Sequence, residues 1–377
     1  MSTIAVVTVD AGGNVPPALR IADELARRGH RIEVLGHRRQ AAEIAAGGHG
    51  FRALDALDFW NSGVRRSVPA AVGEAARLAA DRALEHEVGE AIRLAGADAA
   101  LVDCLMASSA RGARTGGAVT AVLFHTFLEY WQRSYRRGPV GLVARARGAD
   151  PLAEWQHADA RLVASDPALD PASGRGSRVA EAAEWVGAVE HGVAAAPDAT
   201  RPPLVLASLS TTWFPGQTEA YQRILDALGS LPVRGLVTLG GLAPDHALRV
   251  PANVEVRELV PHAEVLPEAS VVIGHGGHST TMRALAHGLP AIVMPMHPML
   301  DQPMVAAAVE RAGAGLALPR TAPTARIAAA VTSALGDERL RAGATRLGER
   351  LRAADAAAAA ADAIERVLAA RPGRAAA

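Results

Sequence analysis

The chain has 377 residues, half of them hydrophobic, which is enough for two domains with well-filled cores. Its formal net charge at pH 7 is zero, so no basic surplus favours binding to nucleic acid or to an anionic membrane. The single cysteine, Cys104, excludes a disulfide within the chain and disfavours a cysteine-based zinc site.

The first half of the chain alternates strand and helix signals. Short apolar runs predict strands at 4–9, 31–35, 99–102, 119–123 and 161–164. Pro16-Pro17 open a helix that Gly29 closes, and residues 70–94 predict one long helical region. Strands that alternate with helices in this way indicate a parallel sheet covered on both faces.

A proline-containing stretch at residues 195–203 is the best candidate for a linker. The alternation then restarts, with strands expected at 204–209, 236–239, 254–259, 271–273 and 291–294. Helices are expected at 219–228, 304–312, 324–335, 338–353 and 356–370. We therefore predict an α/β protein with two doubly wound, Rossmann-like domains, residues 1–199 and 200–377, facing a cleft. The last helix is a candidate for packing back on the N-terminal domain.

The most informative segment is the glycine turn from Gly274 to Thr281, which reads G-H-G-G-H-S-T-T. It follows an apolar run and precedes a helical one, so free backbone N–H groups and the positive end of a helix dipole converge there. Glycines allow close approach of a phosphate, and His275 adds a side-chain donor or a positive charge. The segment therefore predicts an anion-binding site.

Further elements accompany this turn in a fixed order. They are Val260-Pro261-His262 before it, then Ala284-Leu285-Ala286-His287-Gly288-Leu289-Pro290 and Asp301-Gln302-Pro303 after it. The ordered set resembles the donor-binding signature of family 1 glycosyltransferases, most strongly the bacterial members that glycosylate natural products. The resemblance implies the GT-B fold, with an acceptor-binding N-terminal domain and a C-terminal domain that binds a nucleotide sugar.

The resemblance also implies roles for individual residues. His275 and the turn residues Gly277, His278, Ser279 and Thr280 would hold the pyrophosphate. Asp301 and Gln302 would bind sugar hydroxyls, Val260 and His262 would meet the nucleotide base, and Ser210 and Thr211 would face the phosphates. Fixed donors aimed at a leaving diphosphate stabilise the transition state more than the ground state, without a metal. An ordinary turn or helix cap is the alternative for Ser210 and Thr211.

Two departures from the family pattern affect the donor site. Family members often carry a Glu eight residues after the signature His, to hold ribose hydroxyls, whereas this chain has Arg283. This favours dTDP slightly over UDP, unless Arg283 is simply a surface residue. The spacer from Met296 to Leu300 is longer than usual, which makes the geometry of Asp301 less certain.

The general base of the family is missing from its usual place. The resemblance aligns the expected His with Asn14, and an amide cannot act as a general base near neutral pH. Three alternatives remain: Asp10 or Asp103 as the base, which we favour; His125 as the base; or an acidic acceptor that needs little base help, with Asn14 positioning it. Asp10 and Asn14 could equally cap the following helix, and Asp103 could be a turn residue.

Candidate acceptor-binding residues are the loop residue Gly13 and the aromatic side chains Phe59, Phe127 and Trp131, because aromatics make up only 3% of the chain. They suit a pocket for a flat apolar molecule, although packing in a core or a lid is an equal alternative. His275 and His278 have a spacing that can bind metal, but no flanking Cys or acidic ligand completes a site, so we expect no metal.

The resulting prediction is an inverting, metal-independent glycosyltransferase. It would move a hexose or deoxyhexose from a nucleotide diphosphate sugar, its co-substrate, to a small hydroxylated or phenolic natural product, with no other cofactor. A non-catalytic nucleotide-sugar-binding helper and a sugar-nucleotide epimerase of the same fold are the alternatives. The N-terminus lacks a secretory signal and no apolar run approaches the ~20 residues that span a bilayer, so we expect a cytoplasmic protein without stable membrane insertion. A homodimer is compatible with the sequence.

Overall fold

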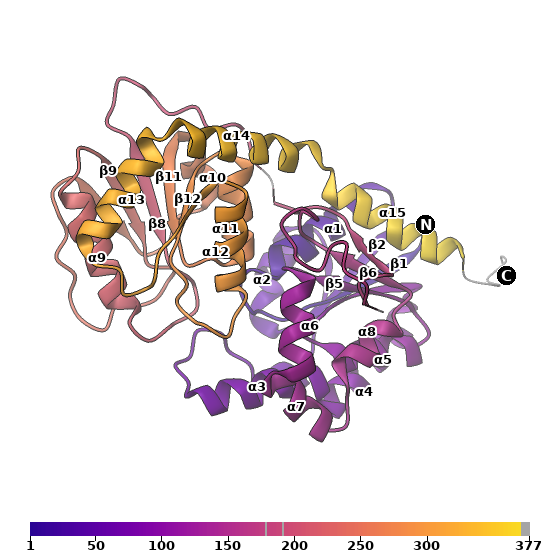
Figure 1. Ribbon diagram of the computed structural model, residues 1–377. Helices are drawn as coiled ribbons and strands as arrows, with labels where there is room; N and C mark the ends of the chain where they lie inside the picture. Colours follow the sequence, from indigo (N-terminus) through magenta and orange to yellow (C-terminus); the bar gives the residue numbers. More distant parts are fainter. Residues whose placement is uncertain (178, 191, 371–377) are drawn as a thin grey trace. The chain divides into compact units, whose positions relative to one another are not determined.

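A computed structural model describes residues 1–177, 179–190 and 192–370 of the chain (Figure 1). Internal contacts divide the chain into two units. The first contains residues 1–62 and 66–189 together with the C-terminal segment from Asp355, and the second contains residues 63–65 and 190–354. The second unit therefore begins at Glu190, before the expected boundary at residue 200, and the last helix belongs to the first unit.

The first unit is built on a seven-stranded parallel sheet with the order β3-β2-β1-β4-β5-β6-β7. Its strands are β1 (Thr3–Val7), β2 (Arg31–Gly36), β3 (Gly50–Ala53), β4 (Ala99–Asp103), β5 (Val119–Phe124), β6 (Ala160–Val163) and β7 (Ala183–Trp185). Its helices are α1 (Val15–Arg27), α2 (Ala41–Ala46), α3 (Val68–Ala80), α4 (Arg82–Ala95), α5 (Ala107–Thr115), α6 (Leu128–Arg137), α7 (Pro139–Ala146), α8 (Pro151–Gln156) and α15 (Ala356–Ala369).

Two apolar layers cover this sheet, one on each face. One layer packs α4, α5, α6 and α8 against the strands, and the other packs α1, α2 and α15. The chain leaves β1 for β2 on one side and returns to β4 on the other, so the strand order reverses between β1 and β4. Ligands of doubly wound sheets bind beyond the carboxyl ends of the strands at such a reversal. The topology therefore predicts a ligand site at the loops that follow β1 and β4.

The region expected as one helix, residues 70–94, forms two helices that meet at Asp81. Asp81 adopts an extended backbone conformation, and its Oδ1 accepts hydrogen bonds from the N–H groups of Ala83 and Leu84 at 2.8 and 3.2 Å. This is the geometry of an N-cap, which satisfies N–H groups that a helix start leaves free. The expectation of one helix was wrong because an internal cap begins a second one.

Helix α15 packs along α1 within the first unit (Figure 1). Its Ile364 and Ala360 are buried in the same apolar layer as Ile21 and Leu25 of α1. At the edge of this contact Arg28 donates to Asp362 at 2.5 Å and to Glu365 at 2.7 Å. The chain therefore returns to its first unit after it has completed the second.

The second unit is built on a six-stranded parallel sheet with the order β10-β9-β8-β11-β12-β13. The strands are β8 (Leu204–Ser208), β9 (Arg234–Thr238), β10 (Val254–Arg257), β11 (Ala269–Gly274), β12 (Ala291–Val293) and β13 (Gly315–Ala317). The helices are α9 (Gln217–Gly229), α10 (His262–Val265), α11 (His278–Ala286), α12 (Gln302–Arg311), α13 (Thr324–Gly336) and α14 (Glu338–Ala353). Here the order reverses between β8 and β11, whose following loops contain Ser210 and His275.

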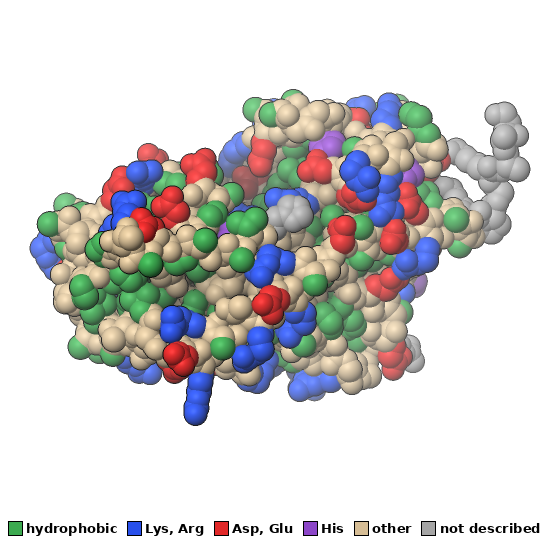
Figure 2. Space-filling view, turned by 90° about the horizontal axis from the view of Figure 1, so that it is seen from above, with side chains coloured by type: hydrophobic (Ala, Val, Ile, Leu, Met, Phe, Trp, Pro, Cys, Tyr) green, Lys and Arg blue, Asp and Glu red, His purple; other side chains and the backbone are tan. Residues whose placement is uncertain are grey.

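Basic and acidic side chains are interspersed on the face drawn in Figure 2. Among the described residues, no helix combines the length and the apolar character that crossing a membrane requires.

Candidate functional site

The reversal point of the first sheet carries a buried polar pair. Asn14, one residue before α1, and Asp103, the last residue of β4, are 1% and 2% exposed. Asn14 Nδ2 donates to Asp103 Oδ2 at 2.8 Å and to the carbonyl of Val9 at 2.8 Å. Asn14 Oδ1 accepts from the N–H of Ala11 at 3.2 Å. The Asn14 side chain thus ties the loop after β1 to Asp103, and it does not cap α1.

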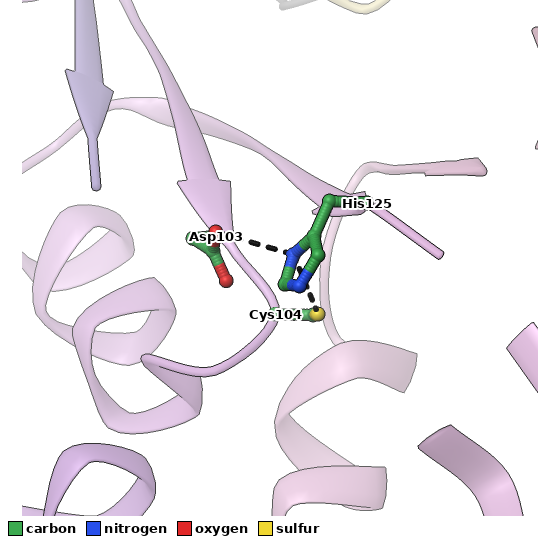
Figure 3. A group of neighbouring side chains, drawn as sticks. All are labelled: Asp103, Cys104 and His125. Atoms are coloured by element: carbon green, nitrogen blue, oxygen red, sulfur yellow. Dashed lines mark hydrogen bonds and ion pairs between the residues drawn. The ribbon is translucent and has the colours of Figure 1, made fainter. Parts of the chain in front are cut away.

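His125 follows the neighbouring strand β5 and turns its ring toward Asp103 (Figure 3). His125 Nδ1 lies 3.3 Å from Asp103 Oδ2. Because a carboxylate only accepts hydrogen bonds, this contact favours the tautomer with the proton on Nδ1 and leaves Nε2 as the basic nitrogen. No described residue is hydrogen bonded to Nε2. A His oriented by a buried Asp is an arrangement suited to general base catalysis.

Cys104 completes a cluster with these two side chains (Figure 3). Its Sγ lies 3.9 Å from His125 Nδ1, and one ligand atom from each of the three residues lies within 4.8 Å of the others. Zinc bonds of about 2.0–2.3 Å place tetrahedral ligand atoms ~3.3–3.6 Å apart, so the sulfur would have to move closer. Burial raises the pKa of the Cys104 thiol well above its usual value. The cluster could hold a metal ion only after that buried thiol had lost its proton.

The other residues predicted in the first unit lie in different surroundings. Asp10 is half-buried, and its backbone carbonyl accepts a hydrogen bond from Trp60 Nε1 at 2.7 Å, while Gly13 is exposed. The ring of Phe59 is half-buried beneath the guanidinium of Arg77, which lies 3.8 Å from its centroid.

Of the aromatic residues predicted to bind the acceptor, Phe127 lies in the core and Trp131 lies against His125. Phe127 is completely buried, so its ring contributes to packing inside the unit. Trp131 is also buried, and its ring meets that of His125 edge to face, with 5.1 Å between the centroids. Trp131 therefore supports one side of the imidazole.

The predicted anion turn of the second unit joins β11 to α11. Gly276 has φ +88°, and a Cβ there would lie 2.8 Å from Val293 Cγ1 and 3.0 Å from the Gln302 carbonyl, so only glycine fits without strain. The N-cap residue of α11 is Gly277, which has no side chain to accept hydrogen bonds from the first N–H groups of the helix. His275 Nδ1 is buried without a hydrogen-bond partner in the described structure. Burial lowers the pKa of His275 to about 4, so this imidazole is a neutral hydrogen-bonding group at pH 7.

The loop after β8 meets this turn. The ring of Phe214 lies 6.3 Å from that of His275 and 6.1 Å from that of His297, measured between centroids. In the same loop Ser210 has φ +150°, a conformation that side chains rarely adopt, and its Oγ accepts from the N–H of Thr212 at 2.8 Å. Thr211 is exposed. Loops from three strands therefore gather at one edge of the sheet.

The residues predicted to meet the nucleotide base lie before β11. Val260 is buried, and His262 is half-buried at the start of α10. Burial, and then the positive charge of Arg283, lower the pKa of His262 to about 4. His262 is therefore near the helix that follows the anion turn. On that helix His278 is buried and Thr280 is half-buried.

Gln302 and Asp301 lie at the start of α12. Gln302 is 2% exposed. Its Oε1 accepts hydrogen bonds from the N–H groups of Met296 and His297 at 2.7 and 2.9 Å. The predicted sugar-binding amide thus has its oxygen engaged in holding the preceding loop. Asp301 is half-buried, and its side chain does not cap α12.

Sequence reasoning missed Glu190, whose carboxylate binds two residues of α11. Ser279 Oγ donates to Glu190 Oε1, and Arg283 donates to Glu190 Oε2 through Nε at 2.9 Å and a terminal nitrogen at 2.6 Å. Arg283 is therefore not a free surface residue. No local signal marks Glu190, because it lies 93 residues before Arg283 and follows no motif.

Comparisons with known proteins relate this geometry to established families. Residues 222–367 match the family described as erythromycin biosynthesis protein CIII-like, C-terminal domain. The chain is 34% identical to a demethyllactenocin mycarosyltransferase of Streptomyces fradiae over 180 residues, which are 47% of this chain and 38% of that protein. The matched stretch thus spans well under half of this relative.

Solved structures match over nearly the whole chain. The glycotransferase of kitacinnamycin is 22% identical, has a TM-score of 0.79, and is matched over 97% of this chain and 99% of its own. The glycosyltransferase VinC in complex with dTDP is 17% identical, has a TM-score of 0.73, and is matched over 98% of this chain and 100% of its own. The predicted resemblance and fold are confirmed: this chain has the GT-B fold, residues 222–367 match the erythromycin biosynthesis protein CIII-like family, and part of the chain is homologous to glycosyltransferases.

Proposed function

We propose that this protein is an inverting, metal-independent glycosyltransferase. It transfers a hexose or deoxyhexose from a nucleotide diphosphate sugar, with dTDP favoured over UDP, to a small hydroxylated or phenolic acceptor. The observation that carries the proposal is the uncapped turn of α11 beside the unpartnered buried Nδ1 of His275, in a segment homologous to glycosyltransferases. The preference for dTDP is supported by the solved complex of VinC and by the lack of a Glu at position 283.

The second unit would bind the donor. A diphosphate gains negative charge as the glycosidic bond breaks, and the N–H groups of Gly277 to Thr280 with the dipole of α11 favour that charge. A neutral His275 adds a hydrogen bond without the cost of burying a cation. These groups are fixed before the ligand arrives, so they need no reorganisation during the reaction.

The first unit would activate the acceptor, with His125 as the base. Nε2 of His125 takes the proton of the acceptor hydroxyl, the new C–O bond forms at the anomeric carbon, and the bond to the diphosphate breaks. Asp103 holds Nδ1–H and stabilises the imidazolium that results. Asp103 is the weaker candidate, because its oxygens already accept from Asn14 at 2.8 Å and from the N–H of Leu105 at 2.9 Å. Asn14, which occupies the place of the family's usual base, orients Asp103.

A binding and turnover experiment tests the proposal. Thermal unfolding with UDP and with dTDP measures stabilisation of the native state, and we expect a larger rise in Tm with dTDP. Mass spectrometry of reactions with a panel of phenols and macrolides, with and without EDTA, then measures transfer. Equal product with EDTA is expected. Binding without transfer to any acceptor would instead favour the sugar-nucleotide-binding helper, and a loss of transfer in EDTA would contradict metal independence.

A further inference from the structure

The contact between Glu190 and α11 places a buried negative charge beside the anion turn. Glu190 is 6% exposed. It accepts one hydrogen bond from Ser279 and two from Arg283, and these two residues lie one turn apart on the same face of the helix. Ser279 is in the first turn of α11, where the helix dipole and free N–H groups favour an anion. The carboxylate therefore binds where an anionic ligand would also be attracted.

The partners of Glu190 are groups that bind phosphate well. A guanidinium presents paired N–H donors that match phosphate oxygens, and a hydroxyl in the first turn of a helix donates in the same direction as the backbone. In this protein both are committed to Glu190. Removing the Glu190 carboxylate from water costs free energy, and apolar pairs of similar volume often stabilise a fold as well as a buried ion pair does. A purely structural role does not require these charges.

We infer that Glu190 sets the affinity of this site for nucleoside diphosphates by neutralising Arg283 and engaging Ser279. The inference rests on the proposed function. With Arg283 neutralised, the diphosphate would be bound mainly by the backbone N–H groups of the turn and by the neutral His275. Uniformly tighter binding of donor and product would lower KM without raising kcat and would slow product release. Glu190 is thus a positioning residue that keeps the product exchangeable.

The test is the affinity for UDP, dTDP and inorganic pyrophosphate, measured by titration calorimetry at two salt concentrations. Glu190→Gln keeps an oxygen for Ser279 but removes the charge, so Arg283 becomes a free cation. We expect all three ligands to bind about tenfold more tightly, which is ~1.4 kcal/mol. The affinity should also fall more steeply with salt than in the wild type, because an added charge pair is screened.

Two further variants separate this role from a structural one. The double variant Glu190→Gln/Arg283→Gln removes both charges and should return the affinity and the salt dependence to wild-type values. Glu154→Gln is the matched control, because Glu154 is 7% exposed and pairs with Arg111 and Arg114 in the first unit. It should leave all three affinities unchanged. Thermal unfolding of each variant reports whether it is folded.

The outcomes distinguish the inference from the proposed function. If the wild type binds neither UDP nor dTDP, the proposed function fails and the inference fails with it. If the wild type binds them but Glu190→Gln binds equally or more weakly, the inference alone is refuted. If Glu190→Gln lowers the affinity for UDP more than the affinity for dTDP, Glu190 would instead be assigned to binding the ribose hydroxyls.

Discussion

Replacing Asp103 by Asn is the sharpest test of the proposed base. The Asp103 carboxylate accepts from two donors, the N–H of Leu105 at 2.9 Å on Oδ1 and Asn14 Nδ2 at 2.8 Å on Oδ2. His125 Nδ1 lies 3.3 Å from Oδ2. An Asn has one acceptor oxygen. If that oxygen keeps Leu105, the new NH2 group faces the NH2 of Asn14 and the Nδ1 of His125.

The consequence for His125 is a change of tautomer. Facing an N–H donor, Nδ1 becomes the acceptor and the proton moves to Nε2, so the nitrogen that should accept the substrate proton is blocked. General base catalysis is worth about 10²–10⁴ in rate, and we expect kcat to fall by at least ~100-fold. The unsatisfied donor of Asn14 should also cost about 1–3 kcal/mol of unfolding free energy.

Steady-state kinetics across pH and urea unfolding measure the two effects. The affinity for dTDP should not change, because the turn at His275 belongs to the second unit. Asp10→Asn is the control, since Asp10 is half-buried and its backbone carbonyl, not its carboxylate, holds Trp60. A kcat for Asp103→Asn within threefold of the wild type, or a large loss for Asp10→Asn, would refute the assignment of His125 as the base.

Three further predictions concern stability. The pKa values of His275 and His262 lie near 4, below the ordinary 6.5, so the unfolded chain takes up protons first as pH falls. The free energy of unfolding should therefore decrease from pH 6.5 toward pH 4. Urea unfolding at pH 7 and at pH 5 should show a smaller decrease for His275→Asn than for the wild type. Gly276→Ala should lower the free energy of unfolding by roughly 2 kcal/mol or more and weaken dTDP binding. Gly313→Ala is the control, because Gly313 has φ +63° but no atom lies within 4 Å of its added Cβ, so it should show only the backbone cost of about 1 kcal/mol. Equal losses for the two variants would contradict the close approach at Gly276. Ile364→Ala should cost about 2–5 kcal/mol in the first unit, measured by thermal unfolding, and a negligible change would mean that α15 does not pack on α1 in solution.

Much of the fold was accessible from the sequence because its signals are local. A strand run followed by Pro16-Pro17 and closed by Gly29 is enough to predict β1 and α1, and the glycine turn before His278 predicts where α11 begins. Helix α14 has the bounds that were expected. The error at residues 70–94 also has a local origin. A polar Asp81 fits the exposed face of one long helix as well as the N-cap of a second helix, and only its extended backbone identifies it as a cap.

The sequence by itself determined the anion turn at His275 and the order of motifs around it, because neighbouring residues form that site. Only the tertiary structure decided which groups surround it. Asn14 reaches Asp103 across 89 residues, because parallel strands bring distant loops to one edge of a sheet. Arg283 on α11 reaches Glu190 across 93 residues, because the second unit packs its helix against the segment with which it begins. The pairing of parallel strands also brings Asp103, the last residue of β4, next to His125, the first residue after β5, a partnership that no spacing in the chain reveals.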